Sequence, residues 1–265
     1  MQEVTIISLG GSIIAPGEVH PGLIKSTQIK STLRTVYKGE SSPSGSIPQW
    51  LKIIDIELLR DFTGAIKEYL ENNNKKKVII VTGGGAPARH YQQAYREIMG
   101  ESSLPEQADW IGIAATRLNA QLLKAVFHPY CREEVVNDPT TVDHFSGRVL
   151  IAAGWKPGFS TDYDAVILAE RFSAGVLINL SNIEMVYTDD PKTNPSATPI
   201  DKIDWNRFIG LIGEEWRPGK NVPFDPVAAR RAGEIGLKVI VASGKDIENL
   251  KAILNGEMFR GTVIG

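Results

Sequence analysis

Residues 78–85 read VIIVTGGG, a short apolar run that ends directly in three glycines. The run lacks polar alternation, which is typical of a strand buried on both faces of a mostly parallel sheet. The amino-terminal stretch VTIISLGGS (4–12) has the same arrangement. Three later runs, each leading into glycine or small polar residues, have the same character: 149–153, 176–180 and 239–241.

Segments with helical periodicity lie between these runs. Residues 57–72 carry apolar side chains at the spacing of one helix face. Further helices are expected at 110–126, 164–172, 226–235 and 246–254. Strands that alternate with helices predict crossover connections and a three-layer αβα sandwich around a mostly parallel sheet. No repeat or linker divides the sequence, so we expect one domain over residues 1–265.

Residues 15–49 do not fit this alternation. The stretch is rich in proline, glycine and serine, and it is too long and too weakly patterned for a core element. We interpret it as an insertion. It is either a solvent-exposed loop or hairpin, or a lid that closes over phosphates with its cationic residues Lys25, Lys30, Arg34 and Lys38.

Composition and charge exclude several classes of protein. The chain carries 29 basic and 31 acidic residues, a net charge of −2, which gives no electrostatic drive toward nucleic acid or membranes. The single cysteine, Cys131, excludes an internal disulfide and a cysteine-based metal cluster. No apolar stretch approaches the ~20 residues that span a bilayer, and the amino terminus lacks the pattern of a secretory signal. We therefore expect a cytoplasmic protein.

Three glycine-containing loops follow predicted strands, at positions 10–12, 83–85 and 154–161. In an open α/β sheet, ligands bind at the carboxyl ends of the strands. Glycine lets the main chain approach an anion closely, and successive N–H groups can point at it. Three such loops predict room for several phosphates, and hence for a phosphate donor together with a phosphorylated acceptor.

Motifs of other enzyme classes do not occur in the sequence. There is no GxxxxGK[ST] loop, no GxGxxG after the first strand, no HxxxH pair and no GxSxG elbow. The stretch SNIEMVYTDDP (181–191) combines a strand end, an aromatic residue and an acidic pair before proline. Such a stretch can stack a base, hold a ribose and help to position Mg²⁺; the alternative interpretation is a solvent-exposed turn.

Six stretches together resemble the amino-acid kinase superfamily, and within it the archaeal-type uridylate kinases. They are SLGGS (8–12), VTGGGAPARHY (81–91), DWIGIAATRLNAQLL (109–123), PGFSTDYDAVILAE (157–170), VYTDDPKTNPSA (186–197) and FDPVAARRAGEIGLKVIVASG (224–244). Their order and spacing also agree with the family. The resemblance implies transfer of the γ-phosphate of ATP to UMP in pyrimidine nucleotide biosynthesis, with Mg²⁺ bound alongside ATP. It also implies a homo-oligomer, either a dimer or a hexamer built as a trimer of dimers.

The resemblance further implies roles for individual residues. The catalytic residues would be Arg89, Asp162 and Lys156. ATP would be bound by Gly10, Gly11, Gly85, Arg89, Ser181, Tyr187 and Asp190. UMP would be bound by Gly84, Asp109, Trp155, Lys156, Pro157, Gly158, Phe159, Ser160 and Thr161. Asp109 is expected to open its helix, where it would either hydrogen-bond the ribose or cap the helix.

Several positions depart from the pattern of the resembled family. Ser8 stands where many members carry a phosphate-binding lysine, so Arg89 or Lys156 would have to supply the positive charge. Trp155 replaces a smaller residue and can reshape the base pocket. Met185 replaces a glycine, and because a positive φ would strain methionine, we expect a different local backbone there.

Other activities within the same fold stay open at this point. The stretch APAR (86–89) lacks the histidine that isopentenyl phosphate kinases carry after the glycines, and His90 is expected to be an ordinary helix residue. The alternatives are a kinase for another small phosphorylated or carboxylate acceptor, and a non-catalytic protein that binds or stores nucleotides or oxyanions.

Overall fold

The computed structural model describes residues 3–17, 53–191, 193–213 and 222–265. The strands are β1 (Glu3–Leu9), β2 (Lys76–Thr82), β3 (Val149–Ala152), β4 (Val176–Ser181), β5 (Val186–Tyr187), β6 (Pro199–Ile200), β7 (Lys202–Ile203), β8 (Lys238–Ser243) and β9 (Thr262–Ile264). The helices are α1 (Gly11–Ile14), α3 (Ile56–Glu71), α4 (Gly85–Met99), α5 (Pro105–Val126), α6 (Thr161–Arg171), α7 (Trp205–Ile212), α8 (Pro226–Glu234) and α9 (Ile247–Asn255). From residue 18 onward the expected insertion, with its four cationic residues, lies outside the described residues.

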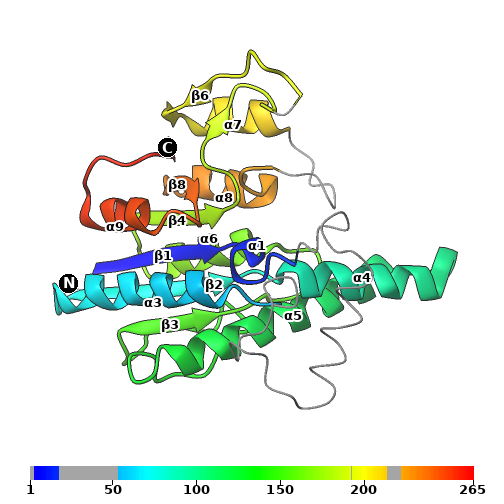
Figure 1. The fold of residues 1–265 in the computed structure, drawn as a ribbon, viewed down its shortest axis with the longest axis horizontal. Coiled ribbons are helices and arrows are strands. Elements are labelled where there is room, and N and C mark those ends of the chain that lie inside the picture. Colours follow the sequence, from blue (N-terminus) through cyan, green and yellow to red (C-terminus); the bar gives the residue numbers. More distant parts are fainter. Residues whose placement is uncertain (1–2, 18–52, 192, 214–221) are drawn as a thin grey trace, which may run out of the picture.

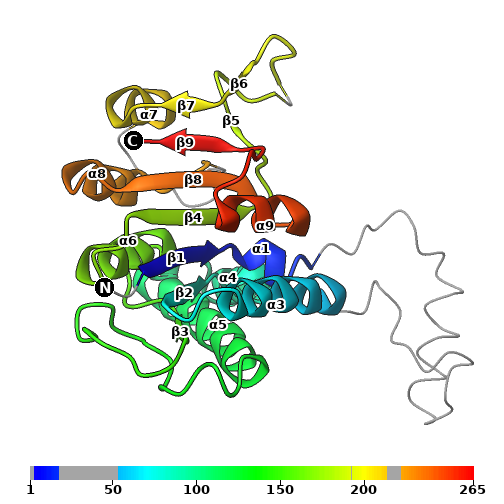
Figure 2. The same ribbon diagram turned by 90° about the vertical axis from the view of Figure 1, so that its left-hand side faces the viewer.

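Seven of the strands form one sheet in the order β3-β2-β1-β4-β8-β9-β7, which Figure 2 shows from end to end. All neighbours are parallel except β8 and β9, which are antiparallel. The last residue of β1, Leu9, lies opposite Thr82 of β2 and Leu180 of β4. The loops that follow these three strands therefore leave the sheet side by side.

Helices cover both faces of the sheet, and each face has its own apolar core. One core joins α3, α5 and α9 to the sheet, with Phe62 and Leu250 among its buried residues. The other joins α6, α7 and α8 to the opposite face, with Leu168 and Phe208 among its buried residues. Figure 2 shows α3 and α9 on one side of the strands and α6 and α8 on the other. The expected three-layer αβα sandwich with a mostly parallel sheet is confirmed.

Capping residues explain where the helices begin. The side chain of Ser160 accepts from Tyr163 N (3.2 Å), so α6 begins at Thr161 and not at the expected residue 164. Pro105 occupies the first turn of α5, a position where its fixed φ suits a helix. This helix consequently begins five residues before the expected start at residue 110. None of the helices in the described ranges is long and apolar enough to cross a membrane.

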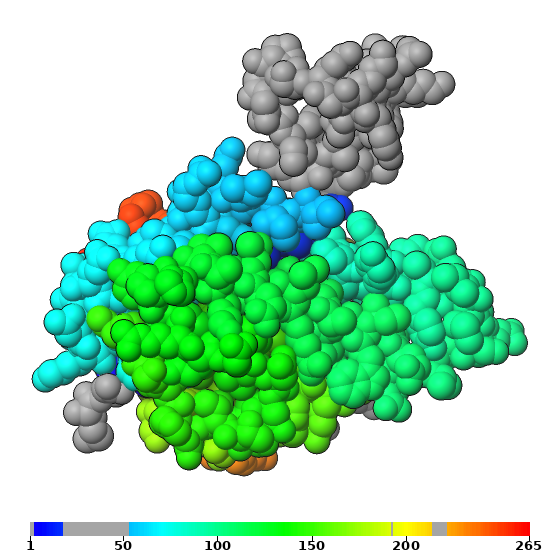
Figure 3. Space-filling model, turned by 90° about the horizontal axis from the view of Figure 1, so that it is seen from below, coloured from blue at the N-terminus to red at the C-terminus, as the bar shows by residue number. Residues whose placement is uncertain are grey.

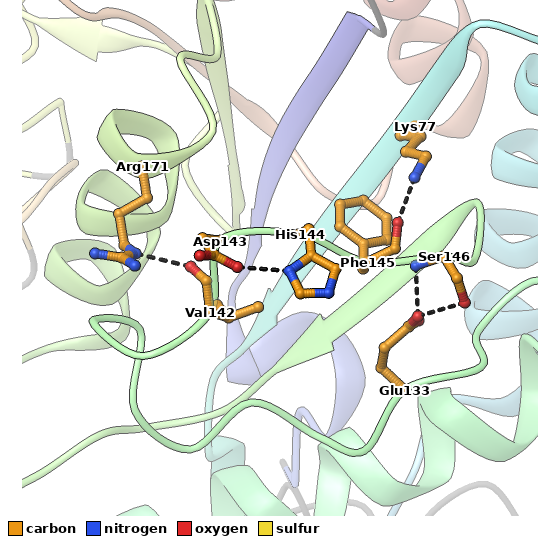
Figure 4. Close-up of polar contacts among 8 residues, drawn as sticks. All are labelled: Lys77, Glu133, Val142, Asp143, His144, Phe145, Ser146 and Arg171. Atoms are coloured by element: carbon orange, nitrogen blue, oxygen red, sulfur yellow. Dashed lines mark hydrogen bonds and ion pairs between the residues drawn. The ribbon is translucent and has the colours of Figure 1, made fainter.

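The segment between α5 and β3 has little regular structure, and it is held by side chains of β2 and α6 and by one of its own (Figure 4). The buried ammonium group of Lys77, on β2, donates to the carbonyl of Phe145 (2.5 Å). The Glu133 carboxylate accepts from the N–H and the hydroxyl of Ser146 (2.6 and 2.7 Å). Arg171 of α6 donates to a main-chain carbonyl of the same segment (2.7 Å). These bonds fix the segment against the sheet beside the loop that follows β3.

Candidate active site

The loops after β1 and β2 pack against each other, main chain to main chain. A Cβ atom on Gly11 would lie 2.0 Å from the nitrogen of Gly85, and one on Gly83 would lie 2.3 Å from the nitrogen of Gly11. Gly85 also has a φ of +67°, which disfavours other residues. The glycines are therefore required for contact between the two loops, quite apart from any approach to phosphate. This contact places the amino terminus of α4 beside the loop after β1.

Helix α5 runs beneath these loops and ties two of them together. The buried side chain of Thr116 accepts from Gly154 N (2.8 Å), while its main-chain carbonyl accepts from the hydroxyl of Thr82 (3.0 Å). One turn later, Asn119 donates to Gly83 O (2.7 Å) and more weakly to Gly84 O (3.3 Å). Sequence reasoning did not single out Thr116 or Asn119, although buried polar residues on an apolar helix face are the signal that marks them.

Asp109 lies in the second turn of α5, so the expectation that it opens or caps this helix is wrong. The first turn starts at Pro105, and the residue before it makes no side-chain cap. Asp109 instead accepts a hydrogen bond from Gly158 N (3.0 Å) with one carboxylate oxygen. This bond connects α5 to the loop 154–160, in the region where the acceptor nucleotide was expected.

Trp155 is anchored through its main chain by two charged side chains. Asp164 accepts from Trp155 N (3.1 Å), and Arg117 donates to Trp155 O (3.2 Å). Asp164 is fully buried, and burial raises its pKa to about 7. The loop after β3 is thus fixed at several points by α5 and α6.

Aromatic side chains form a column on this loop. The rings of Trp155 and Phe159 are 5.2 Å apart, and those of Phe159 and Tyr163 are 4.7 Å apart. The ammonium group of Lys156 lies 3.8 Å from the centroid of the Trp155 ring. The hydroxyl of Thr140 donates to the Asp138 carboxylate (2.6 Å), and this bond, together with the Trp155 side chain, holds the pKa of Asp138 below its usual value. The short distance from Lys156 to the Trp155 ring makes this a cation–π contact with the column.

Asp162 lies at the amino end of α6 and contacts the strand that carries the first glycine loop. The hydroxyl of Ser8 donates to one of its carboxylate oxygens (2.9 Å), and Asp225 N donates to the other (3.3 Å). Burial raises the pKa of Asp162 to about 6. Ser8, which stands in place of the family lysine, thus forms part of the support for this carboxylate.

Arg89 lies on α4, one turn beyond the triple glycine. Its guanidinium donates to Pro16 O (3.3 Å), near the end of the first described stretch. His90, next to it, is an exposed helix residue. Arg89 is thus exposed and tied to the short segment that follows α1.

The expected donor side lies at the ends of β4 and β5. Gly10 N donates to Leu180 O (2.8 Å), so the first glycine loop lies directly beside Ser181. Tyr187 lies in the two-stranded sheet of β5 and β6. The turn after it is held by Asp189, whose carboxylate accepts from Asp190 N (2.8 Å). These residues are brought to the same edge of the sheet as the glycine loops.

Glu184 and Met185 have different local surroundings. Glu184 forms an ion pair with Arg260 (2.9 Å). Met185 is buried, and in the described ranges the only non-glycine residue with a positive φ is Ser173. Met185 therefore avoids the left-handed conformation, as the sequence analysis expected for this position.

The carboxyl edge of the sheet can accordingly hold an extended anionic ligand. Two main-chain loops and the amino end of α4 supply N–H groups, Arg89 supplies a positive charge, and a braced aromatic loop lies at one side. In the described ranges no three histidine, cysteine or acidic residues are grouped to hold a metal ion. This donor set suits phosphate groups more than a metal held by protein ligands alone.

Comparisons with known proteins agree with this arrangement. Residues 3–243 match the amino acid kinase family. The chain is 32% identical over 184 residues to a uridylate kinase of Hyperthermus butylicus, covering 67% of this chain and 78% of that protein. It is 36% identical over 185 residues to a uridylate kinase of Methanocorpusculum labreanum, covering 67% and 76%.

Solved structures show the same relationship. The crystal structure of uridylate kinase from Archaeoglobus fulgidus superimposes with a TM-score of 0.72 at 30% sequence identity, covering all of both chains. A UMP kinase from Bacillus anthracis superimposes with a TM-score of 0.68 at 21% identity and supports the fold alone. The fold, the order of the glycine loops and the family match together establish that this chain belongs to the amino acid kinase family.

Proposed function

We propose that this chain is a UMP kinase that transfers the γ-phosphate of ATP to UMP, giving ADP and UDP. The observation that carries the proposal is the meeting of three strand-end loops at one edge of the sheet, with Gly11 packed directly against Gly85. The similarity to uridylate kinases over two thirds of the chain supports the same activity.

The proposed reaction needs alignment and charge neutralisation more than proton transfer. A phosphate oxygen of UMP attacks the γ-phosphorus of ATP, and the bond from that phosphorus to the β-γ bridging oxygen breaks. The phosphate of UMP is largely a dianion at neutral pH, so no general base is required. Arg89 would neutralise charge between donor and acceptor, and the main-chain N–H groups of Gly84 and Gly85 would face the phosphates.

The other proposed roles follow from where the side chains lie. Gly10, Gly11, Ser181, Tyr187 and Asp190 would line the ATP side. Asp109 would bind the ribose of UMP with the oxygen that does not accept from Gly158, while residues 155–161 would enclose the nucleotide. Lys156, whose ammonium group lies over the Trp155 ring, would supply positive charge at the acceptor side.

Mg²⁺ would accompany ATP. It is commonly bound by one or two carboxylates together with substrate phosphates and water, which suits a site without a protein-only metal cage. Asp162 is the residue proposed to help hold it, because its carboxylate lies at the amino end of α6 next to Ser8 of β1. Burial raises the pKa of this carboxyl to about 6, and a bound cation would favour its ionised form. When bound, the ion would offset charge on the phosphates.

We also propose that two copies of the chain associate through the outer face of α4 and α5. Figure 3 shows this part of the surface, with α5 in green and α4 in blue-green. These two helices carry exposed large apolar side chains: Tyr91 and Ile98 on α4, and Trp110 and Leu118 on α5. Light scattering tests the association: a mass of at least a dimer is expected for the wild type, with a smaller mass for Leu118→Glu. A monomeric wild type would contradict it.

A coupled assay for ADP release tests the proposed activity across UMP, CMP, dTMP, isopentenyl phosphate, acetylglutamate and carbamate. Turnover is expected with UMP in the presence of MgATP. Turnover with a non-nucleotide and none with UMP would contradict the assignment. Binding of ATP without turnover on any acceptor would show a non-catalytic binding protein.

A further inference from the structure

Asn119 is a buried polar residue in the middle of α5, with only 3% of its surface exposed. Asparagine is a poor helix former, and burial of an amide is costly unless it is hydrogen-bonded. Its side-chain NH₂ group donates to Gly83 O at 2.7 Å and to Gly84 O at 3.3 Å. Its amide nitrogen therefore lies within hydrogen-bond distance of two consecutive carbonyls of the glycine loop after β2.

These two bonds set the direction of the next two main-chain N–H groups. In a planar trans peptide, the carbonyl oxygen and the following N–H point in opposite directions. Since the oxygens of Gly83 and Gly84 point toward Asn119, the N–H groups of Gly84 and Gly85 point away from α5. They face the side on which the loop after β1 lies, where Gly11 is in contact with Gly85.

The first turn of α4 leaves few other donors for an anion. The initial N–H groups of a helix have no partner within it. Ala86 N donates to Ala15 O (2.9 Å), and residue 87 is proline, which has no N–H. Gly84 and Gly85 thus provide the donors of this turn that can serve a ligand.

We propose that Asn119 is a positioning residue for phosphate binding: it directs the N–H groups of Gly84 and Gly85 at the acceptor phosphate without touching the substrate. The proposal rests on the proposed function, in which Gly84 binds the phosphate of UMP. Leucine has a similar volume and would fill the same space, but it would leave Gly83 O without this donor and the peptide between Gly83 and Gly84 free to rotate. Gly84 O would keep the first bond of α4, because Gly84 is the residue that caps this helix. Aspartate has nearly the same shape, but it would place a carboxylate oxygen against those carbonyls.

The variants Asn119→Leu and Asn119→Asp, with Thr5→Val as a control, test this role. Thr5 is a buried polar residue at the other end of β1, and its hydroxyl is hydrogen-bonded to that of Tyr69 (3.2 Å). Removing it costs a buried hydrogen bond without touching a loop of the site. If Asn119→Leu does not fold, Asn119→Asp carries the test because its shape is preserved.

Isothermal titration calorimetry gives the decisive comparison: the Kd for UMP and the Kd for ATP are measured separately for the wild type and for each of the three variants. We expect the Kd for UMP to rise about 10-fold in both Asn119 variants, on the scale of one hydrogen bond to a charged group. The Kd for ATP is expected to stay within about twofold, as is typical of a change outside its contacts. In Asn119→Asp the UMP affinity is expected to recover partly at low pH, because a protonated carboxyl can donate one bond.

Equal weakening of UMP and ATP would show general loosening of the site and would overturn the proposal. A UMP affinity no weaker than that of Thr5→Val would also overturn it. Failure of the proposed function looks different, since the wild type itself would then bind no UMP. In that case the amide NMR shifts of Gly84 and Gly85 in Asn119→Leu still decide the matter: changed shifts support the positioning role, and unchanged shifts overturn it.

Discussion

The proposed acceptor and donor sides of the carboxyl edge differ in what holds their loops. On the acceptor side, the loop after β3 is fixed by side chains from other elements, among them Asp109 and Thr116 of α5 and Asp164 of α6. On the donor side, the turn after β5 is fixed by its own residues, as when Asp189 accepts from Asp190 N and from Asn194 (2.9 Å).

This difference indicates which loops of the proposed site are already ordered before a ligand binds. Buried polar networks rigidify a loop, whereas a surface turn held by local bonds adapts at low cost. We infer that selection of the acceptor depends on a preorganised loop, while the donor nucleotide orders its own surroundings on binding. Substitutions on the acceptor side should therefore change the KM for UMP alone, and substitutions on the donor side the KM for ATP alone.

The largest effect is expected at Arg89, which would serve both substrates. Arg89→Ala should reduce turnover about 100-fold or more, the scale of losing one preorganised donor to developing charge. Steady-state kinetics measure this, and Arg89→Lys should retain part of the activity, since it keeps the charge but loses the planar fork. Turnover within a few-fold of the wild type would remove Arg89 from the proposed site.

Asp162→Asn should lower turnover at least 10-fold, because it removes the carboxylate proposed to organise Mg²⁺. The same change should stabilise the ligand-free protein above pH 6 by about 2 kcal/mol. This is less than the full penalty implied by the pKa shift, because solvent screens part of the charge. The folded pKa of about 6 lies above the unfolded value. The ionised carboxylate is therefore destabilising, and this penalty is absent below about pH 4, grows up to pH 6 and is constant beyond it.

Urea unfolding of wild type and Asp162→Asn across this pH range measures the stability effect. The side chain of asparagine can still accept from Asp225 N while its NH₂ group donates to the Ser8 hydroxyl, so both contacts have a replacement. A stability difference that does not change with pH would contradict the raised pKa.

Asp109→Ala tests the acceptor side alone. It removes the acceptor of the Gly158 N–H and the proposed ribose contact, so the KM for UMP should rise about 10-fold. The KM for ATP should be unchanged, because the bond between Gly158 and Asp109 lies on the proposed acceptor side. An equal rise in both KM values would break the distinction between the two sides.

Tyr187→Leu tests the donor side, with the smallest expected effect. Loss of an aromatic surface for the base should raise the KM for ATP about fivefold, the lower range for one stacking contact. The KM for UMP and the unfolding midpoint should be unchanged within error, because Tyr187 lies in a short two-stranded sheet. A change in UMP kinetics larger than that for ATP would place Tyr187 outside the donor side.

The fold was predictable because its signals are local. Apolar runs followed by glycine give the parallel strands, and the caps that set the helix starts are readable in hindsight, as Ser160 shows for α6. The antiparallel strand β9 was not predicted, since three residues give too little pattern. Helix α7 was also missed, because its eight residues are too few to show periodicity clearly.

The site was predictable only in part. The glycines and Arg89 lie within short motifs, so their neighbourhood follows from the strand order. Thr116 and Asn119 were missed because they act over long sequence distances, as in the bond from Asn119 to Gly83. Asp164 bonds a residue only nine positions away, but the sequence does not show that its side chain is buried. Asp109 was placed at a helix start because no sequence signal distinguishes it from a cap once Pro105 is overlooked.

Phosphorus NMR of a mixture of ATP, UMP and Mg²⁺ with the full chain tests the central claim most directly. It identifies the product, not only the loss of ATP. We predict that the γ-phosphate signal of ATP disappears while the β-phosphate signal of UDP grows in equal amount. Release of inorganic phosphate without UDP, or no change in either substrate, would contradict it.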